Sequence, residues 1–138
     1  MEIPAFCQNS HFFVSPGKKY IYREEYPITP FSTVFYIQKG SILLMKNMTK
    51  KDKFTKKRKA GDFFGMTEIF IGLEERLFTA ITSEKSEIYY WSDAEFISLL
   101  QKDRAFANLI TMNLSNMLRS ITDKLNVVSY QYKQLIKK

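Results

Sequence analysis

Hydrophobic and polar positions alternate in short segments through the first part of the chain, which is the pattern of half-buried β-strands. These segments are rich in β-branched and aromatic residues, and short turns such as 39–40 and 83–85 separate them. Short strands at this spacing predict a jelly roll, that is a double-stranded β-helix, over about residues 12–92. The strands are expected at residues 18–23, 33–38, 41–46, 53–59, 76–82 and 86–91.

The period of the pattern changes to that of a helix at Ser92. Ser92 and Glu95 match a capping box, in which each side chain accepts a hydrogen bond from the backbone amide of the other residue. A break at residues 102–103 separates this short helix from a long one that begins near Arg104, so C-terminal helices are expected over about residues 93–136. The apolar stripe of the short helix consists of Phe96, Leu99 and Leu100.

The long helix carries apolar residues at alternating spacings of four and three, which is a heptad seam. Its N-terminal end has a wider stripe, which predicts packing on the strand domain, whereas the distal half has a narrow seam and predicts a parallel dimer coiled coil. A helix folded back on its own domain is the alternative. The seam consists of Leu114, Leu118, Ile121, Leu125, Val128, Tyr132 and Leu135. The wider stripe adds Phe106, Leu109, Ile110, Met112 and Met117.

The segment 61–82 combines a glycine-bracketed turn, a short apolar helix and an arginine at the head of a strand. Two consecutive aromatics between the glycines, Phe63 and Phe64, are expected to anchor the loop to a core. Residues 67–71 are long enough for about one helical turn, with Thr67 as its cap, and the exposed amides of such a turn attract anions. If the guanidinium of Arg76 faces this loop, the two would together form a phosphate clamp. The alternative is that Arg76 pairs with a nearby acid: Glu74, Glu75 or Asp62.

This arrangement resembles the phosphate-binding cassette of cyclic nucleotide-binding domains, most closely the sensor domain of the catabolite-activator/FNR (Crp/Fnr) regulators. The resemblance rests on Gly-Asp-Phe-Phe-Gly at 61–65, on Arg76, and on an upstream hairpin, Tyr-Ile-Gln-Lys-Gly-Ser-Ile at 36–42. It extends over roughly residues 18–138, and it implies a jelly roll followed by a helix that forms a dimer axis and closes over a bound ligand.

Several residues depart from the pattern of the nucleotide-binding members. Met66 stands where those members carry a glutamate for the ribose hydroxyl, and Leu77 stands where they carry a serine or threonine for the phosphate. Glu68 is two positions too late and is expected to point elsewhere. Since each hydrogen bond to a charged group contributes about 1.5–3 kcal/mol, we expect weak binding of cyclic nucleotides or a different small anionic ligand. The ligand-binding residues implied by the resemblance are Gly65, Met66, Thr67, Arg76, Leu77 and Thr122.

Composition adds one local feature, a basic segment from Lys46 to Lys59. It contains eight of the 21 basic residues and one of the 14 acidic residues, so it accounts for the net charge of +7 while the rest of the chain is balanced. Its alternation is poor, with Phe54 as the one clear inward residue, and it is expected to be a solvated hairpin. The alternative is a contact surface for an acidic partner or a nucleic acid backbone.

The remaining composition limits the class of protein. A length of 138 residues fits one domain, no apolar run is long enough to span a membrane, and the N-terminus lacks the features of a signal peptide. The single cysteine, Cys7, fits a reducing cytoplasm and is expected to be inert. His11 is the only histidine, so no metal site is expected.

Two functions follow from these observations. The first is a regulatory ligand-sensing domain, either stand-alone or the sensor portion of a longer regulator, that forms a homodimer and binds a cyclic nucleotide or another small anion. The second is a dimeric interaction scaffold that binds no ligand and uses the basic segment at 46–59. An enzyme is not expected, because the sequence shows no catalytic triad, metal cluster or nucleotide-triphosphate loop. No helix-turn-helix for reading DNA is expected within these residues either.

Overall fold

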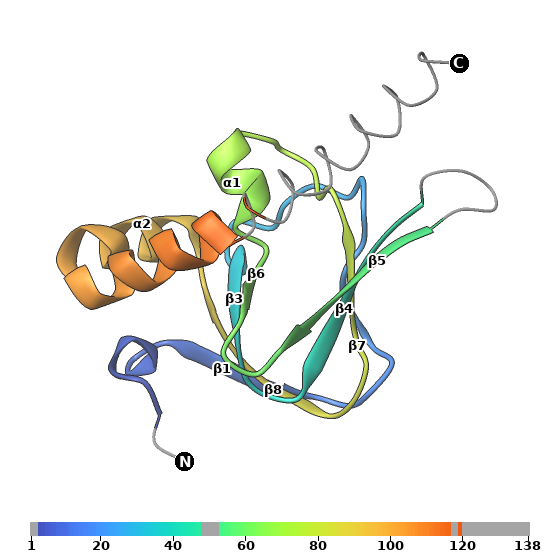
Figure 1. Ribbon diagram of the computed structural model, residues 1–138, viewed down its shortest axis with the longest axis horizontal. Helices are drawn as coiled ribbons and strands as arrows, with labels where there is room; N and C mark the ends of the chain where they lie inside the picture. The colour runs from blue at the N-terminus through green and yellow to red at the C-terminus, as the bar shows by residue number, and fades with distance from the viewer. Residues whose placement is uncertain (1–2, 48–52, 117–118, 120–138) are drawn as a thin grey trace, which may run out of the picture.

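The strands form two four-stranded antiparallel sheets, as expected for a jelly roll (Figure 1). The computed structural model describes residues 3–47, 53–116 and 119. The strands are β1 (His11–Ser15), β2 (Tyr20–Tyr22), β3 (Val34–Lys39), β4 (Ser41–Asn47), β5 (Lys53–Lys59), β6 (Phe63–Phe64), β7 (Thr79–Thr82) and β8 (Ser86–Trp91). The helices are η1 (Ala5–Cys7), α1 (Thr67–Ile71) and α2 (Asp93–Lys102), and residues 104–116 are also helical. The sheet orders are β1-β8-β3-β6 and β2-β7-β4-β5.

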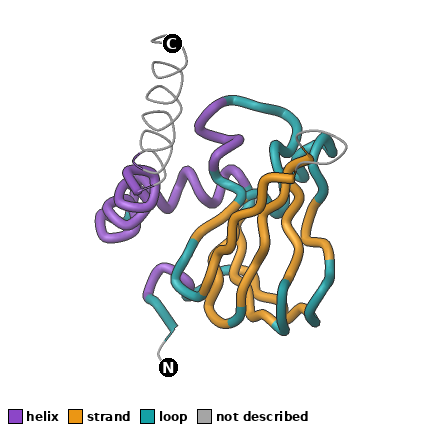
Figure 2. The backbone as a smooth tube through the Cα atoms, turned by 45° about the vertical axis from the view of Figure 1, so that its right-hand side comes forward, coloured by secondary structure: helices purple, strands orange, loops and turns teal. Residues whose placement is uncertain are grey.

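Strand β3 is buried on both faces, and it separates two hydrophobic cores. Phe35 and Ile37 face the inner core of the sandwich, where they pack with Ile42 and Ala80 of the opposite sheet. The alternate residues of β3 face a second core on the outer side of the sheet. The helices gather on that side of the strand layers (Figure 2), so they cover the face that would otherwise expose apolar side chains.

The outer core is built mainly from aromatic rings. Phe6 of η1 lies 5.2 Å from both Tyr36 and Phe106, measured between ring centroids. Trp91 and Phe106 are 5.7 Å apart in the same cluster. Rings at these separations add about 0.5–1.5 kcal/mol per pair to the energy of burial. This is where much of the aromatic content of the sequence is used, and it fastens the N-terminal turn and the helices to the sheet.

Cys7 is also buried in the outer core, as its expected inertness requires. Burial raises the pKa of its thiol to about 12, because the thiolate would lose its hydration. The thiol therefore stays protonated and unreactive near neutral pH.

His11, at the start of β1, is exposed and contacts the carboxylate of Glu95 at 3.1 Å, which confirms its place at a strand end facing solvent.

Strand β7 begins three residues later than the pattern predicts, at Thr79 instead of Arg76. The prediction is wrong because the backbone at Arg76 pairs with the loop before β3 instead of with a sheet. The Arg76 amide donates to the Tyr26 carbonyl at 2.9 Å, and the Glu25 amide donates to the Arg76 carbonyl at 2.7 Å. Strand β2 is likewise shorter than expected, since only Tyr20–Tyr22 pairs with β7.

The capping box at the start of α2 is confirmed. The Glu95 amide donates to Ser92 Oγ at 3.1 Å, and the Ser92 amide donates to Glu95 Oε1 at 2.9 Å. The bond from the Ser92 amide to the carboxylate lowers the pKa of Glu95 most of all, and the Ser92 side chain and His11 lower it further. The expected break also appears: Asp103 ends α2, and its carboxylate accepts from the Phe106 amide at 3.0 Å.

The 104–116 helix packs on the outer core through Phe106 and Ile110, which are both buried. Met112 was expected on the same stripe, but its side chain is 62% exposed, so that prediction is wrong. Two residues along an α-helix rotate by about 200°, which turns Met112 away from the face that carries Ile110. Leu114, the first residue of the seam, packs partly against the core of its own chain.

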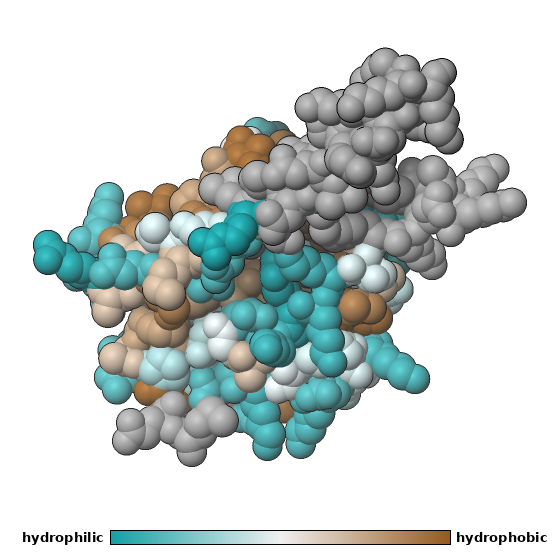
Figure 3. All heavy atoms as spheres, in the orientation of Figure 1, coloured by the Kyte–Doolittle hydropathy of each residue, from teal (hydrophilic) through white to brown (hydrophobic). Residues whose placement is uncertain are grey.

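The remaining seam residues, from Leu118 to Leu135, and Met117 lie outside the described residues. Within the described residues, no helix has the length and apolar content needed to cross a bilayer. On the face shown in Figure 3, hydrophilic residues predominate over the strands, and hydrophobic residues gather on the side where α2 lies. The exposed apolar side chains of the helical part include Ile97 and Met112.

The substitution Ser92→Ala should lower the free energy of unfolding by about 1 kcal/mol, because it removes the acceptor for the Glu95 amide. Urea denaturation followed by circular dichroism measures this. Ser98→Ala is the matched control: it makes the same change inside α2 and should be neutral or slightly stabilising. Equal losses in both variants would contradict the capping role.

Candidate functional site

The two aromatics of the segment between β5 and β7 are buried, as the sequence predicts. Phe63 enters the outer core and Phe64 enters the inner core, because adjacent residues of β6 point to opposite faces of the sheet. Gly65 then turns the chain with a φ of +87° and leads into α1. The loop is therefore held by both cores at once.

Arg76 is almost completely buried, with 3% of its surface exposed. Its Nη1 donates to the Gly65 carbonyl and its Nη2 donates to the Thr33 carbonyl, each at 2.8 Å. A longer bond of 3.5 Å reaches the Ser32 carbonyl, and the guanidinium carbon lies 4.1 Å from the centre of the Tyr22 ring. The guanidinium thus lies inside the fold, where the phosphate clamp was expected.

The carboxylate of Glu68 lies beside this guanidinium. Its Oε2 is 3.4 Å from Arg76 Nη1, and its Oε1 accepts a hydrogen bond from the Leu77 amide at 3.1 Å. Only 1% of the surface of Glu68 is exposed, so this is an ion pair buried in the protein. Glu68 was expected to point away from the ribose position, and α1 turns its side chain inward towards Arg76.

The acids proposed as partners of Arg76 have other roles. Glu74 and Glu75 are exposed, and Asp62 accepts a hydrogen bond from the Lys59 amide at 2.9 Å, which closes the turn after β5. The alternative that Arg76 pairs with Glu74, Glu75 or Asp62 is therefore wrong, because its ion pair is with Glu68. Removing one member of a buried ion pair typically lowers the free energy of unfolding by about 3–5 kcal/mol, because the other charge is left buried without a partner.

Met66 and Thr67 occupy the positions between the glycine turn and α1. Met66 is 1% exposed and packs in the outer core, so an apolar side chain fills the place where the resemblance implies a ribose acceptor. The expectation that Thr67 caps α1 is wrong: Thr67 is the first helical residue, and Met66 is the N-cap without a side-chain hydrogen bond. Thr122 lies outside the described residues.

A small polar cavity of about 110 Å³ lies between β5 and the 104–116 helix. Arg58 contributes a partly buried guanidinium, and burial lowers its pKa. Its Nε is buried and has no hydrogen-bond partner within the described residues. The cavity is lined by Lys56, Arg58, Asp62, Phe63, Asn113 and Asn116.

The sequence did not predict this cavity, because β5 was expected to be solvated. Residues Lys56 and Arg58 lie opposite Leu44 and Ile42 of β4, and paired residues point to the same face of a sheet. Both partners are buried in the inner core, so Lys56 and Arg58 face inward as well. Only the other set, including Lys57 and Lys59, is exposed.

Metal binding finds no support in the described part of the chain, where no three His, Cys, Asp or Glu side chains converge.

The charge of the basic segment at 46–59 is partly neutralised at its N-terminal end. Lys46 lies 3.8 Å from the carboxylate of Glu24, and its ammonium donates to the Leu77 carbonyl at 3.2 Å.

Comparisons with known proteins agree with this geometry. The family model described as cyclic nucleotide-binding domain matches residues 15–103. The catabolite activator protein of Thermus thermophilus has a similar structure, with a TM-score of 0.75 at 17% identity, over 90% of this chain and 57% of that chain. Comparison with curated protein sequences gave no significant match.

Two further solved structures show the same likeness. The global regulator CLP of Xanthomonas campestris, described as responsive to c-di-GMP, gives a TM-score of 0.74 at 21% identity, over 88% of this chain and 60% of that one. A transcriptional regulator of Thermotoga maritima gives 0.76 at 17% identity, over 91% and 95%. Identities this low show a shared fold alone, and the chain spans less than two thirds of the first two proteins.

Gly65→Ala should destabilise the protein by about 3–5 kcal/mol, because the added Cβ is both strained and obstructed. It would lie 2.6 Å from the Thr33 carbonyl oxygen and 3.1 Å from Arg76 Nη1. Gly72→Ala is the matched control: its φ of +85° is similar, but its Cβ would enter open space, so a loss of about 1 kcal/mol is expected. Urea denaturation compares the two, and equal losses would contradict a tight contact at Gly65.

Proposed function

Because the chain belongs to the cyclic nucleotide-binding domain family, we propose that it is a regulatory ligand-sensing domain in which cyclic nucleotides bind weakly. It would act as a stand-alone signalling module or as the sensor part of a Crp/Fnr-like regulator, in a regulatory rather than a catalytic role. The observation that carries this proposal is the buried pair of Arg76 and Glu68. The ligand contacts we propose are Gly65, Met66, Thr67, Arg76, Leu77 and Thr122.

The carboxylate of Glu68 occupies the position where a ligand phosphate would meet Arg76. It also accepts a hydrogen bond from the amide of Leu77, the residue that stands where the family carries a serine or threonine for the phosphate. A cyclic nucleotide must therefore displace a buried carboxylate before its phosphate can pair with the guanidinium. The net free energy of binding is therefore small, because one charge-assisted hydrogen bond to Arg76 replaces another.

The polar cavity beside the 104–116 helix supports a ligand that lies between this segment and the helix. Arg58 supplies a cation there, and the side-chain amides of Asn113 and Asn116 supply neutral donors and acceptors. Asp62 and Phe63 of the same segment form the facing wall. The cavity thus joins the two elements whose relative arrangement a bound ligand would change.

A second candidate function is a dimeric interaction scaffold that binds no ligand. The ion pair between Arg76 and Glu68 also favours this function. In that case Glu68 holds Arg76 permanently, and the exposed Lys57 and Lys59 of β5 offer a contact for an acidic partner. The two candidates differ in whether the carboxylate ever leaves the guanidinium, and replacing the carboxylate separates them.

Glu68→Gln should increase the affinity for cAMP and cGMP by about 10- to 100-fold, because it removes the competing charge and leaves an oxygen for the Leu77 amide. Isothermal titration calorimetry measures this, and the wild-type protein should give no heat at about 1 mM ligand. Glu74→Gln is the matched control, since Glu74 is exposed and should leave the wild-type behaviour unchanged. Urea denaturation of each variant verifies that it is folded.

Two outcomes of this titration are informative beyond the expected one. Tight binding by the wild-type protein would show that Glu68 does not compete with the phosphate, which contradicts the proposal. No gain in the folded Glu68→Gln variant would remove the cyclic nucleotide from consideration and leave the scaffold.

We also propose that the chain forms a homodimer through the heptad seam that begins at Leu114. The introduction of a charge at a core position of such a seam disrupts it, so Leu125→Glu should convert the dimer to a monomer in sedimentation equilibrium. Asn126→Glu places the same residue outside the seam and should stay dimeric. A monomeric wild-type protein, or the same state in both variants, would contradict this interface.

A further inference from the structure

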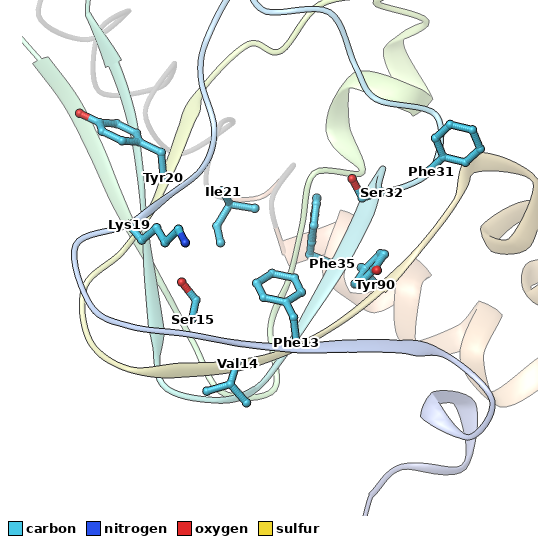
Figure 4. Close-up of a pocket in the computed structure, with 10 residues that line it drawn as sticks. All are labelled: Phe13, Val14, Ser15, Lys19, Tyr20, Ile21, Phe31, Ser32, Phe35 and Tyr90. Carbon is cyan, nitrogen blue, oxygen red and sulfur yellow. The ribbon is translucent and has the colours of Figure 1, made fainter.

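A second and larger cavity, of about 390 Å³, opens between β1, β2 and the start of β3 (Figure 4). None of the described ligand contacts proposed above lines it, although Phe35 forms part of its wall and also lies 5.9 Å from the Arg76 guanidinium. Its volume is in the range of cavities that enclose a small molecule. The lining residues that the argument uses are Phe13, Lys19, Ile21, Phe31, Phe35 and Tyr90.

Half of the residues that line this cavity are aromatic, and Val14 and Ile21 add apolar side chains. The ring of Tyr90 lies 5.6 Å from that of Phe13 and 6.3 Å from that of Phe35. Figure 4 shows the side chains of Phe13, Ile21 and Phe35 directed into the cavity from three strands. Phe31 is 77% exposed beside it, which is unusual for a phenylalanine. Flat walls of this kind suit a planar apolar group, which stacks or packs edge-on against the rings.

One charged group is available at this cavity, the ammonium of Lys19. Figure 4 shows the Lys19 side chain extending inward between Ile21 and Ser15. Lys19 has no ion pair with any described residue, and no acidic residue lines the cavity. The hydroxyl of Ser15 already donates to the Pro16 carbonyl at 3.2 Å. The charge of the site is therefore positive and unbalanced, which favours an anionic group on the ligand.

We propose that this cavity binds a small molecule with one flat apolar body and one carboxylate. The body lies among Phe13, Phe35 and Tyr90, the carboxylate pairs with Lys19, and Phe31 covers the opening. A nucleotide fits this chemistry poorly, because the cavity offers its phosphate a single cation. The proposal does not depend on the function proposed for the Arg76 site.

Titration with 1-naphthaleneacetate and its neutral amide, 1-naphthaleneacetamide, tests the proposal on the whole chain. Both share the flat body, so their difference isolates the charge. Chemical-shift changes in NMR spectra should give the acid a dissociation constant on the order of 1 mM, as expected for a compound of this size. The acid should bind about three- to fivefold more tightly than the amide. The preference is this small because Lys19 is exposed, so solvent screens the ion pair between its ammonium and the ligand carboxylate.

Three variants locate the binding. Lys19→Met should abolish the preference for the acid while the amide binds as before, and Phe31→Ala should weaken both compounds several-fold. Lys85→Met is the matched control: it removes an exposed lysine that does not line the cavity, and it should change neither affinity. All three positions are exposed, so the variants should fold. Glu68→Gln should also leave both affinities unchanged, which separates this cavity from the Arg76 site.

The proposal is overturned by any of three results. The first is that neither compound binds at about 10 mM. The second is that the wild-type protein binds the acid and the amide equally. The third is that the Lys19→Met and Phe31→Ala variants bind both compounds as the wild type does. Failure of cyclic nucleotides to bind the Glu68→Gln variant would bear only on the function proposed for Arg76.

Discussion

The structure depends on the burial of one guanidinium. Arg76 is removed from water, so each of its donors needs an acceptor within the protein. The acceptors come from segments far apart in the sequence, the Thr33 carbonyl before β3 and the Gly65 carbonyl before α1, while Glu68 supplies the opposite charge. Satisfying Arg76 therefore brings these segments together, and loss of the Glu68 carboxylate would leave a buried charge uncompensated.

The same region lies where the two hydrophobic cores meet. Phe63 packs with the rings beneath the helices, and Phe64 stacks on Phe35 inside the sandwich at 4.8 Å. Phe106 of the 104–116 helix lies 5.7 Å from Phe63. A rearrangement at Arg76 would thus reach both the helices and the strands, as the proposed sensing role would require.

Membership of a family sets the fold, whereas individual residues set the chemistry of a site. In this chain an apolar Met66 and an internal carboxylate from Glu68 stand in the positions where the resemblance implies contacts to a nucleotide. The segment keeps the backbone turns and the arginine of a phosphate-binding loop, but its charge is balanced from within. The unbalanced cation of Lys19 lies elsewhere, at an aromatic cavity formed by other strands.

The strand pattern, the capping box at Ser92 and the glycine turn at Gly65 could be predicted, because hydrophobic alternation, caps and turns depend on residues close in sequence. The partner of Arg76 could not, since the contact with Glu68 depends on how residues 74–76 pair with the loop before β3. The inward face of β5 likewise follows from its register with β4, which places Arg58 opposite the buried Ile42. Local pattern specifies which elements form, and long-range packing specifies which side chains meet, because contacts between distant segments exist only once the sheets have closed.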